Sequence, residues 1–200
     1  MSLPSVEEIR ALHEKYAPTA EALDLVRTHC EIVWSVAEHL AERASLQAHL
    51  DLELVRAGCL LHDIGVYALC TADGHVDLEN YIRHGVLGYE ILSNEGYPER
   101  LCRICSCHTG VGITKHDVLA QGLPLPPCDF VAETAEERLV MYADKFHSKT
   151  SPPKFLSAPA YARYIGRFGD EKVDAFNALR EEFGEPDVAA LATHYGHALE

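Results

Sequence analysis

Six histidine and aspartate side chains fall on the apolar faces of predicted helices, and this feature restricts the fold more than any other. His29 lies on the stripe formed by Val26 and Val33, and the other five are placed in a similar way: His62, Asp63, His84, His108 and Asp144. Residues three, four or seven positions apart share one face of a helix. A buried aspartate costs free energy unless it is paired or bound to a cation. The fold must therefore bring these side chains to common partners.

Helix start and stop signals recur along the chain and predict the elements that carry this set. Ser5 with Glu8 and Thr134 with Glu137 form capping boxes, and Gly65 is interpreted as the glycine that follows a helix end. No segment shows the alternation of a strand. The signals predict a loop at 66–79 and helices at about 6–16, 20–43, 51–63, 80–95, 98–108, 114–121, 134–148, 158–168, 170–183 and 186–195. We therefore predict an all-α protein, a helical bundle with a helical C-terminal extension.

The length of the chain fits a single domain with a small appendage. Its 200 residues can bury one substantial core. We divide the chain into an N-terminal helix packed on the core (1–19), the main helical domain (20–150) and a C-terminal extension of the same domain (151–200). The extension is expected either to cover the pocket or to form the interface of a homodimer.

The formal charge of the chain limits its partners. Lysine and arginine number 17 against 31 aspartate and glutamate residues, which gives −14 at pH 7. Nucleic-acid backbones and anionic membranes attract basic proteins, so we expect neither a nucleic-acid polymer nor a membrane as partner. The first residues lack a signal pattern, no apolar run reaches the ~18 residues of a membrane span, and the seven cysteines lack framework spacing. These features predict a cytoplasmic protein with reduced thiols.

A shared metal site accounts for the six polar side chains together. Imidazole nitrogens and carboxylate oxygens suit Zn, Fe, Mn or Co. Adjacent helical residues point about 100° apart, so His62 and Asp63 can reach one ion only at a helix end. Gly65 is expected to supply that end. The alternative, six polar residues that are satisfied separately, fits any single histidine well but fits the whole set poorly.

The ordered set resembles the ligand pattern of the HD-domain metal-dependent phosphohydrolase superfamily. His62-Asp63-Ile64-Gly65 is similar to its HDIG form, and the resemblance covers about residues 20–150. The segments 84–88, 108–110 and 142–145 resemble those of small HDIG proteins, and the ligand set with His108-Thr109 is also similar to HD-type diadenosine-polyphosphate hydrolases of bacteria. The implied fold is an HD-domain helical bundle.

The resemblance implies a binuclear centre of two divalent ions, drawn from Fe, Mn, Co, Zn or Mg. The first ion would be held by His29, His62, Asp63 and Asp144, and the second by Asp63, His84 and His108. Two such ions and two aspartates leave a local charge of about +2, which attracts phosphate in spite of the acidic chain. The implied reaction is cleavage of a phosphoester of a small phosphorylated metabolite, a nucleotide above all, by a metal-activated hydroxide.

Catalytic and substrate-binding roles are predicted for the adjacent residues His62 and Asp63 and for residues that follow Asp144. His62, Asp63 and Lys145 are the predicted catalytic residues, and Lys145, His147 and Lys149 are predicted to bind the substrate phosphate. The alternative interpretation of the basic residues is a helix C-terminus that favours cations.

Two other functions stay open at this point. Some members of the same superfamily hold two irons with this ligand set and activate dioxygen, and ligand type alone does not separate them from hydrolases. Others lose ligands and bind nucleotides without catalysis. Because all six positions are filled here, the non-catalytic interpretation is disfavoured. Phosphate release and oxygen consumption distinguish the first two activities.

Overall fold

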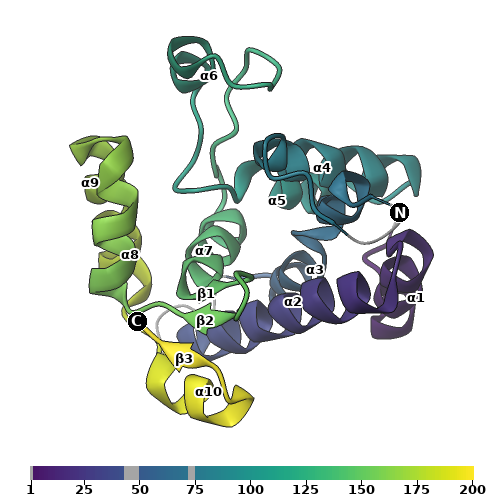
Figure 1. Cartoon of the computed structure of the whole chain (residues 1–200), viewed down its shortest axis with the longest axis horizontal. Coiled ribbons are helices and arrows are strands. Elements are labelled where there is room, and N and C mark those ends of the chain that lie inside the picture. Colours follow the sequence, from purple (N-terminus) through teal and green to yellow (C-terminus); the bar gives the residue numbers. More distant parts are fainter. Residues whose placement is uncertain (1, 43–49, 72–74) are drawn as a thin grey trace.

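The computed structural model describes residues 2–42, 50–71 and 75–200, and these form the predicted all-α fold (Figure 1). The α-helices are α1 (Val6–Tyr16), α2 (Ala20–Ala41), α3 (Leu52–Leu61), α4 (His84–Asn94), α5 (Glu99–Cys107), α6 (Lys115–Gln121), α7 (Ala135–Ala143), α8 (Ala158–Ile165), α9 (Asp170–Phe183) and α10 (Val188–Tyr195). Short 3₁₀ helices are η1 (Ile64–Leu69), η2 (Tyr81–Arg83), η3 (Asp144–Phe146) and η4 (Gly166–Phe168). The helical signals of the sequence therefore identified these α-helices, although some of their bounds differ from the expected ones.

Helix α2 is the longest of these helices and forms the base of the core. Thr19 caps its first turn, and its stripe of Val26, Val33 and Leu40 is completely or almost completely buried. It packs against α3 and α7, while α4 packs on both α5 and η1. Burial of these apolar stripes supplies the main stabilisation of the fold. The ends of α3, α5 and α7 consequently converge near the middle of α2.

The segment after α7 differs from the expected helix over 134–148. That helix ends at Ala143, and the chain continues through η3 into the strand β1 (His147–Ser148). Strand β1 pairs antiparallel with β2 (Lys154–Phe155), which pairs in parallel with β3 (Ala198–Leu199). Two-residue strands are too short to show an alternating pattern. The expected loop at 66–79 overlaps η1 at residues 66–69, and its residues 72–74 lie outside the described residues. The expected helix end near residue 43 also lies outside them.

Gly65 has a different role from the one the sequence suggested. Helix α3 ends at Leu61, and Gly65 lies within η1 without a left-handed φ. A Cβ at this position would lie 2.0 Å from the carbonyl oxygen of His84 and 2.3 Å from the amide nitrogen of Gly88. The glycine is therefore required because the backbone of α4 passes directly over it.

Helix α6 lies at the tip of an arm that projects from the bundle beside α8 and α9 (Figure 1). Lys172 of α9 donates to the Asp117 carboxylate at 2.7 Å and to the Gly112 carbonyl at 3.1 Å, which links the arm to the C-terminal extension. The extension also packs on α7 through Phe176 and Phe183, whose rings contact Tyr142. None of the described helices is both long enough and apolar enough to cross a membrane.

Candidate metal centre

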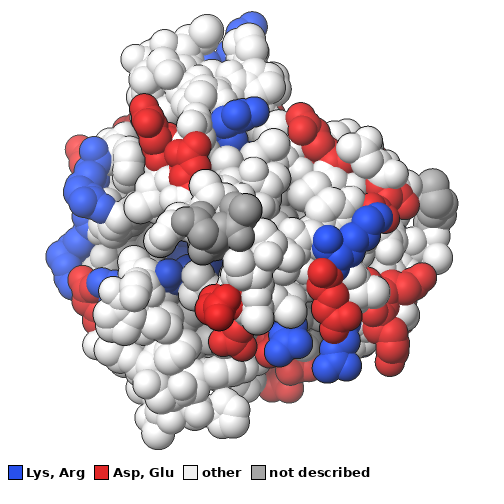
Figure 2. Space-filling view, turned by 45° about the vertical axis from the view of Figure 1, so that its right-hand side comes forward, with Lys and Arg blue, Asp and Glu red and all other residues white. Residues whose placement is uncertain are grey.

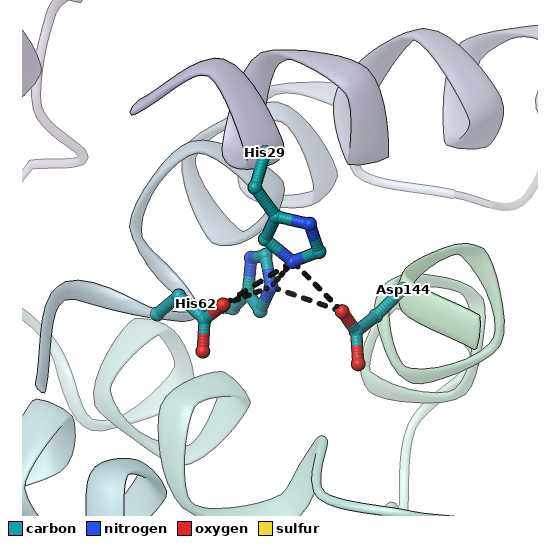
Figure 3. A group of neighbouring side chains, drawn as sticks. His29, His62 and Asp144 are labelled. Atoms are coloured by element: carbon teal, nitrogen blue, oxygen red, sulfur yellow. Dashed lines mark hydrogen bonds and ion pairs between the residues drawn. The ribbon is translucent and has the colours of Figure 1, made fainter. Parts of the chain in front are cut away.

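Four of the six predicted ligands meet in a first cluster (Figure 3). His29 projects from α2, His62 and Asp63 follow the end of α3, and Asp144 begins η3. The Nε2 atom of His29 lies 3.2 Å from Nε2 of His62, 3.0 Å from Oδ1 of Asp144 and 3.2 Å from Oδ2 of Asp63. Two atoms that are each ~2.1 Å from one ion lie ~3.0–3.4 Å apart at right or tetrahedral angles. The spacing of these atoms therefore suits one ion.

The remaining two histidines form a second cluster that shares Asp63. His84 and His108 approach each other with their Nε2 atoms at 3.0 Å, and Oδ1 of Asp63 lies 3.5 and 3.6 Å from them. Asp63 thus directs Oδ2 to the first cluster and Oδ1 to the second. Asp63 is therefore the residue that the two clusters share, and its position between two ions stays a prediction.

Three of the histidines have their tautomer fixed by the backbone. In His62, His84 and His108, Nδ1 lies 2.7 Å from the carbonyl oxygen of the residue three positions earlier. His62 and His108 follow the last turn of a helix, where carbonyls lack partners within the helix. A carbonyl only accepts, so Nδ1 carries the proton and Nε2 is left as a free ligand. Local helix geometry therefore prepares these imidazoles for a metal.

The unpaired atoms of the site show that a cation fits it. Burial lowers the pKa of His84 to about 3 and also lowers that of His108, so both rings are neutral near pH 7. Their unprotonated Nε2 atoms consequently face each other without a hydrogen between them. Oδ1 of Asp63 is buried and has no hydrogen-bond partner among the described residues. Three electron-rich atoms at this spacing repel one another unless a cation lies between them.

The first cluster attracts positive charge more strongly. Burial by itself lowers the pKa of His62, but the charge of Asp63 and the hydrogen bond with Asp144 outweigh it and hold that pKa well above its ordinary value. Without a metal, Nε2 of His62 therefore holds a proton, and a bound cation would take the place of that proton. Burial opposes ionisation of Asp63 as well, and the nearby charges of Lys149 and His62 hold its pKa well below its ordinary value. The ionised state of Asp63 is the one that binds a metal.

The predicted substrate-binding residues surround the two clusters. Lys145 donates to Asp144 at 2.6 Å and to the carbonyl of His108 at 2.9 Å, and Lys149 contacts Oδ2 of Asp63. Burial opposes the charge of Lys149, but Asp63 raises the pKa of this lysine above its ordinary value. His147 is buried, and its Nδ1 lies 2.9 Å from Nδ1 of His29. All three line the same cavity as the clusters.

The cavity has a volume of about 930 Å³ and joins the clusters to the surface. At its inner end lie Asp63, His84, His108, Asp144, Lys145 and Lys149. Its outer part is mainly apolar, and Tyr161, Tyr164 and Phe168 line it from α8 and η4. Figure 2 shows that one face of the molecule is hollowed, with basic side-chain atoms inside the hollow. The cavity therefore combines a charged floor with an apolar wall that the C-terminal extension supplies.

One contact of the site escaped prediction from sequence. His197 lies after α10, and its Nδ1 is 3.0 Å from Nε2 of His147. Nothing in the spacing of His197 relates it to the ligands, because it reaches them through the pairing of β3 with β2. The seven cysteines are free in the structure.

We expect divalent cations to stabilise the fold through this site. A ligand that binds the native state alone at 100 times its Kd adds about 2.7 kcal/mol to the free energy of unfolding. Mn²⁺ or Co²⁺ should therefore raise the melting temperature of chelator-treated protein, as measured by circular dichroism. A melting temperature that does not respond to either ion would contradict the assignment. Because Mg²⁺ prefers oxygen ligands, it should have a smaller effect at equal concentration.

Comparisons with known proteins agree with this geometry. The sequence matches the family model described as "HD domain" over residues 26–149. It is 40% identical over 125 residues to a tRNA (cytidine(56)-2'-O)-methyltransferase of Picrophilus torridus, which covers 62% of this chain and 32% of that protein. It is also 40% identical over 117 residues to the uncharacterized protein MJ0778 of Methanocaldococcus jannaschii, which covers 58% of this chain and 62% of the relative. The chain thus spans less than two thirds of either relative.

Solved structures with the same fold support the family match. The HD domain of the L. monocytogenes phosphodiesterase PgpH aligns with a TM-score of 0.55 at 17% identity and covers 94% of this chain and 98% of that domain. The same domain in complex with cyclic-di-AMP aligns equally well. At this level of identity the likeness shows the fold alone. Because the family match extends over more than half of the sequence, this chain belongs to the HD domain family.

Proposed function

We propose that the chain is a metal-dependent phosphohydrolase that cleaves a phosphoester of a small phosphorylated metabolite, with a nucleotide as the favoured class. The observation that carries the proposal is the pair of ligand clusters that share Asp63 on the floor of a cavity which also holds Lys145 and Lys149. Membership of the HD domain family supports it, as does the fold shared with the HD domain of a phosphodiesterase.

The metal centre and the lysines would have different roles at the phosphate. Two bound divalent ions supply an activated water and stabilise negative charge on phosphoryl oxygens. Asp63 and Asp144 hold and orient the ions. The ammonium of Lys145 has three N–H groups, and two of them donate to Asp144 and to the carbonyl of His108. One N–H group therefore remains for a phosphate oxygen. With Asp63 engaged as a metal ligand, the ammonium of Lys149, which contacts Oδ2 of Asp63, would be free to bind the phosphate.

The aromatic side chains in the apolar wall of the cavity favour a substrate with a planar ring. The rings of Tyr161 and Tyr164 lie 5.8 Å apart, and those of Tyr164 and Phe168 lie 6.1 Å apart, measured between centroids. Tyr164 and Phe168 are each about half exposed even though they line an apolar cavity. Exposed aromatic rings beside a polar floor are typical of ligand sites. A nucleobase fits such a wall, while the phosphate reaches the clusters.

Two relatives are named as methyltransferases, but we do not propose methyl transfer for this chain. The matched region accounts for 32% of each of those proteins. We propose that methyl transfer belongs to the part of those proteins outside the shared region, and that the shared region carries the metal site.

A single protein sample can test the proposed reaction against its alternative. The protein is purified without oxygen, its metal content is measured, and phosphate release and oxygen uptake are followed on the same sample. We expect Mn²⁺-, Fe²⁺- or Co²⁺-loaded protein to release phosphate from nucleotides. Oxygen uptake without phosphate release would support a di-iron oxygenase instead. Nucleotide binding without turnover would support a non-catalytic module, and either result would overturn the proposal.

Removing an aromatic ring from the wall should affect nucleotides selectively. Base–aromatic stacking contributes about 1–3 kcal/mol, so we expect Tyr164→Ala to raise the KM for a nucleotide about tenfold. The KM for glycerol phosphate, which has no ring, should change by less than twofold. Leu119→Ala is the matched control, since Leu119 is exposed on α6 and does not line the cavity. Equal losses for both substrates would contradict the assignment of this wall to the base.

A further inference from the structure

His29 differs from the other histidine ligands in what holds its second ring nitrogen. The other three donate Nδ1–H to a backbone carbonyl near the end of a helix. His29 lies in the middle of the 22-residue helix α2, where the carbonyls are already used by the helix. Its Nδ1 instead faces Nδ1 of His147 at 2.9 Å. The tautomer of this ligand is therefore set by a side chain outside α2.

The contact continues to a third histidine. Nε2 of His147 lies 3.0 Å from Nδ1 of His197, and the two ring planes are inclined by 23° with centroids 5.2 Å apart. His147 is 5% exposed and also packs edge-on against Phe155, whereas His197 is only partly buried. The three rings form a chain of hydrogen bonds from the first metal cluster toward the surface, which we call the histidine chain (His29, His147, His197).

The hydrogen bonds of the histidine chain can run in only one direction when a metal is bound. A metal at Nε2 of His29 requires the proton of that ring on Nδ1, which donates to Nδ1 of His147. His147 must then carry its proton on Nε2 and donate it to Nδ1 of His197. The opposite direction would place a proton on Nε2 of His29, at the atom that has to bind the ion.

We propose that His147 and His197 are positioning residues that hold His29 in its metal-binding tautomer, so that the C-terminal extension completes the site of the first ion. The proposal rests on metal binding by the first cluster, which the proposed function also requires, but it does not depend on hydrolysis. It changes the role predicted for His147 from a ligand of phosphate to a support for a metal ligand. It also assigns a positioning role at the metal centre to His197, which lies 50 residues after His147 in the sequence.

Substitutions in the histidine chain should lower metal affinity, and alanine variants should lose more affinity than asparagine variants. Loss of a hydrogen-bond partner behind a ligating histidine commonly costs 10–100-fold in metal affinity. We expect His147→Ala to weaken the first Co²⁺ binding step about tenfold or more in an absorption titration. In His147→Asn and His197→Asn, an amide oxygen can take the place of Nδ1 as acceptor, so both should bind more tightly than the corresponding alanine variants. The control is His194→Ala, because His194 is an exposed residue of α10 that does not belong to the histidine chain.

The unmodified protein provides a measurement that does not depend on folding of the variants. Nitrogen NMR of the Zn²⁺-loaded protein reports which ring nitrogen of each histidine carries the proton. We expect the proton on Nδ1 of His29 and on Nε2 of both His147 and His197. A proton on Nδ1 of His147 would overturn the proposal, as would a His147→Ala variant that binds Co²⁺ within twofold of the unmodified protein. Failure of the unmodified protein to bind either ion would overturn the proposed function as well, whereas metal binding without hydrolysis would count against that function alone.

Discussion

Replacing Asp63 by asparagine is expected to remove both metal ions and to lower phosphoester hydrolysis by ~1,000-fold or more. The carboxylate serves both clusters, with Oδ2 toward His29 and Oδ1 toward His84 and His108. An amide keeps the size of the side chain but carries no negative charge to hold two cations. Metal content by mass spectrometry and phosphate release on the same preparation measure the effect. An Asp63→Ala variant should behave in the same way.

Controls separate the loss of charge from the loss of folding. Asp24→Asn, on an exposed position of α2, should retain both ions and full activity. His84→Ala removes a ligand of the second cluster only, so we expect one ion to remain in the first. Circular dichroism establishes that each variant is folded. A folded Asp63→Asn protein that retains two ions, or that still hydrolyses its substrate, would refute the assignment of the site.

Gly65→Ala is expected to lower the free energy of unfolding by at least about 3 kcal/mol, toward the upper end of what overpacking costs. The added methyl group would lie 2.0 Å from the His84 carbonyl oxygen and 2.3 Å from the Gly88 amide nitrogen. Both are backbone atoms, so no rotation of a side chain relieves the contact. Helix α4 must move away from η1, and His84 moves with it. Metal binding by the second cluster should therefore weaken together with stability.

Urea unfolding followed by circular dichroism measures this loss, and Gly166→Ala provides the matched control. Gly166 also has a negative φ, and among the described residues the only close contact its Cβ would make is with a methyl group of Val173 at 3.2 Å. We expect that variant to remain within about 1 kcal/mol of the original protein. If the two alanine variants were equally stable, the close approach of α4 to Gly65 would not be what requires a glycine.

The helices and the grouping of the six candidate ligands were predictable because local sequence signals encode them. Capping boxes at Ser5 and Thr134 mark helix starts that the structure confirms, and apolar spacing places His29 inside α2. Buried polar groups need partners, so ligands in several helices indicated one shared site even without knowledge of the packing. The structure brings all six together in two clusters.

Other parts of the site depend on contacts between distant segments and could not be predicted. Gly65 was assigned to a helix end because a sequence shows turn chemistry but does not show which backbone passes overhead. His147 was expected to share a helix with Asp144, whereas the chain leaves the helix after Ala143 and places His147 in β1 beside His29. The link to His197 arises from the parallel pairing of β2 and β3, for which no local pattern exists. The roles of Lys145 and Lys149 at the phosphate stay predictions.

The order in which the ligands occur along the chain also sets an order for maturation during synthesis. All ligands of the second cluster have left the ribosome once His108 has emerged, but the first cluster waits for Asp144, and its support waits for His197. A nascent chain that ends before Asp144 therefore has the ligands of the second cluster but an incomplete first cluster. Loading of the first ion would consequently mark a chain whose synthesis has passed Asp144, and full affinity for that ion would mark one whose synthesis has passed His197.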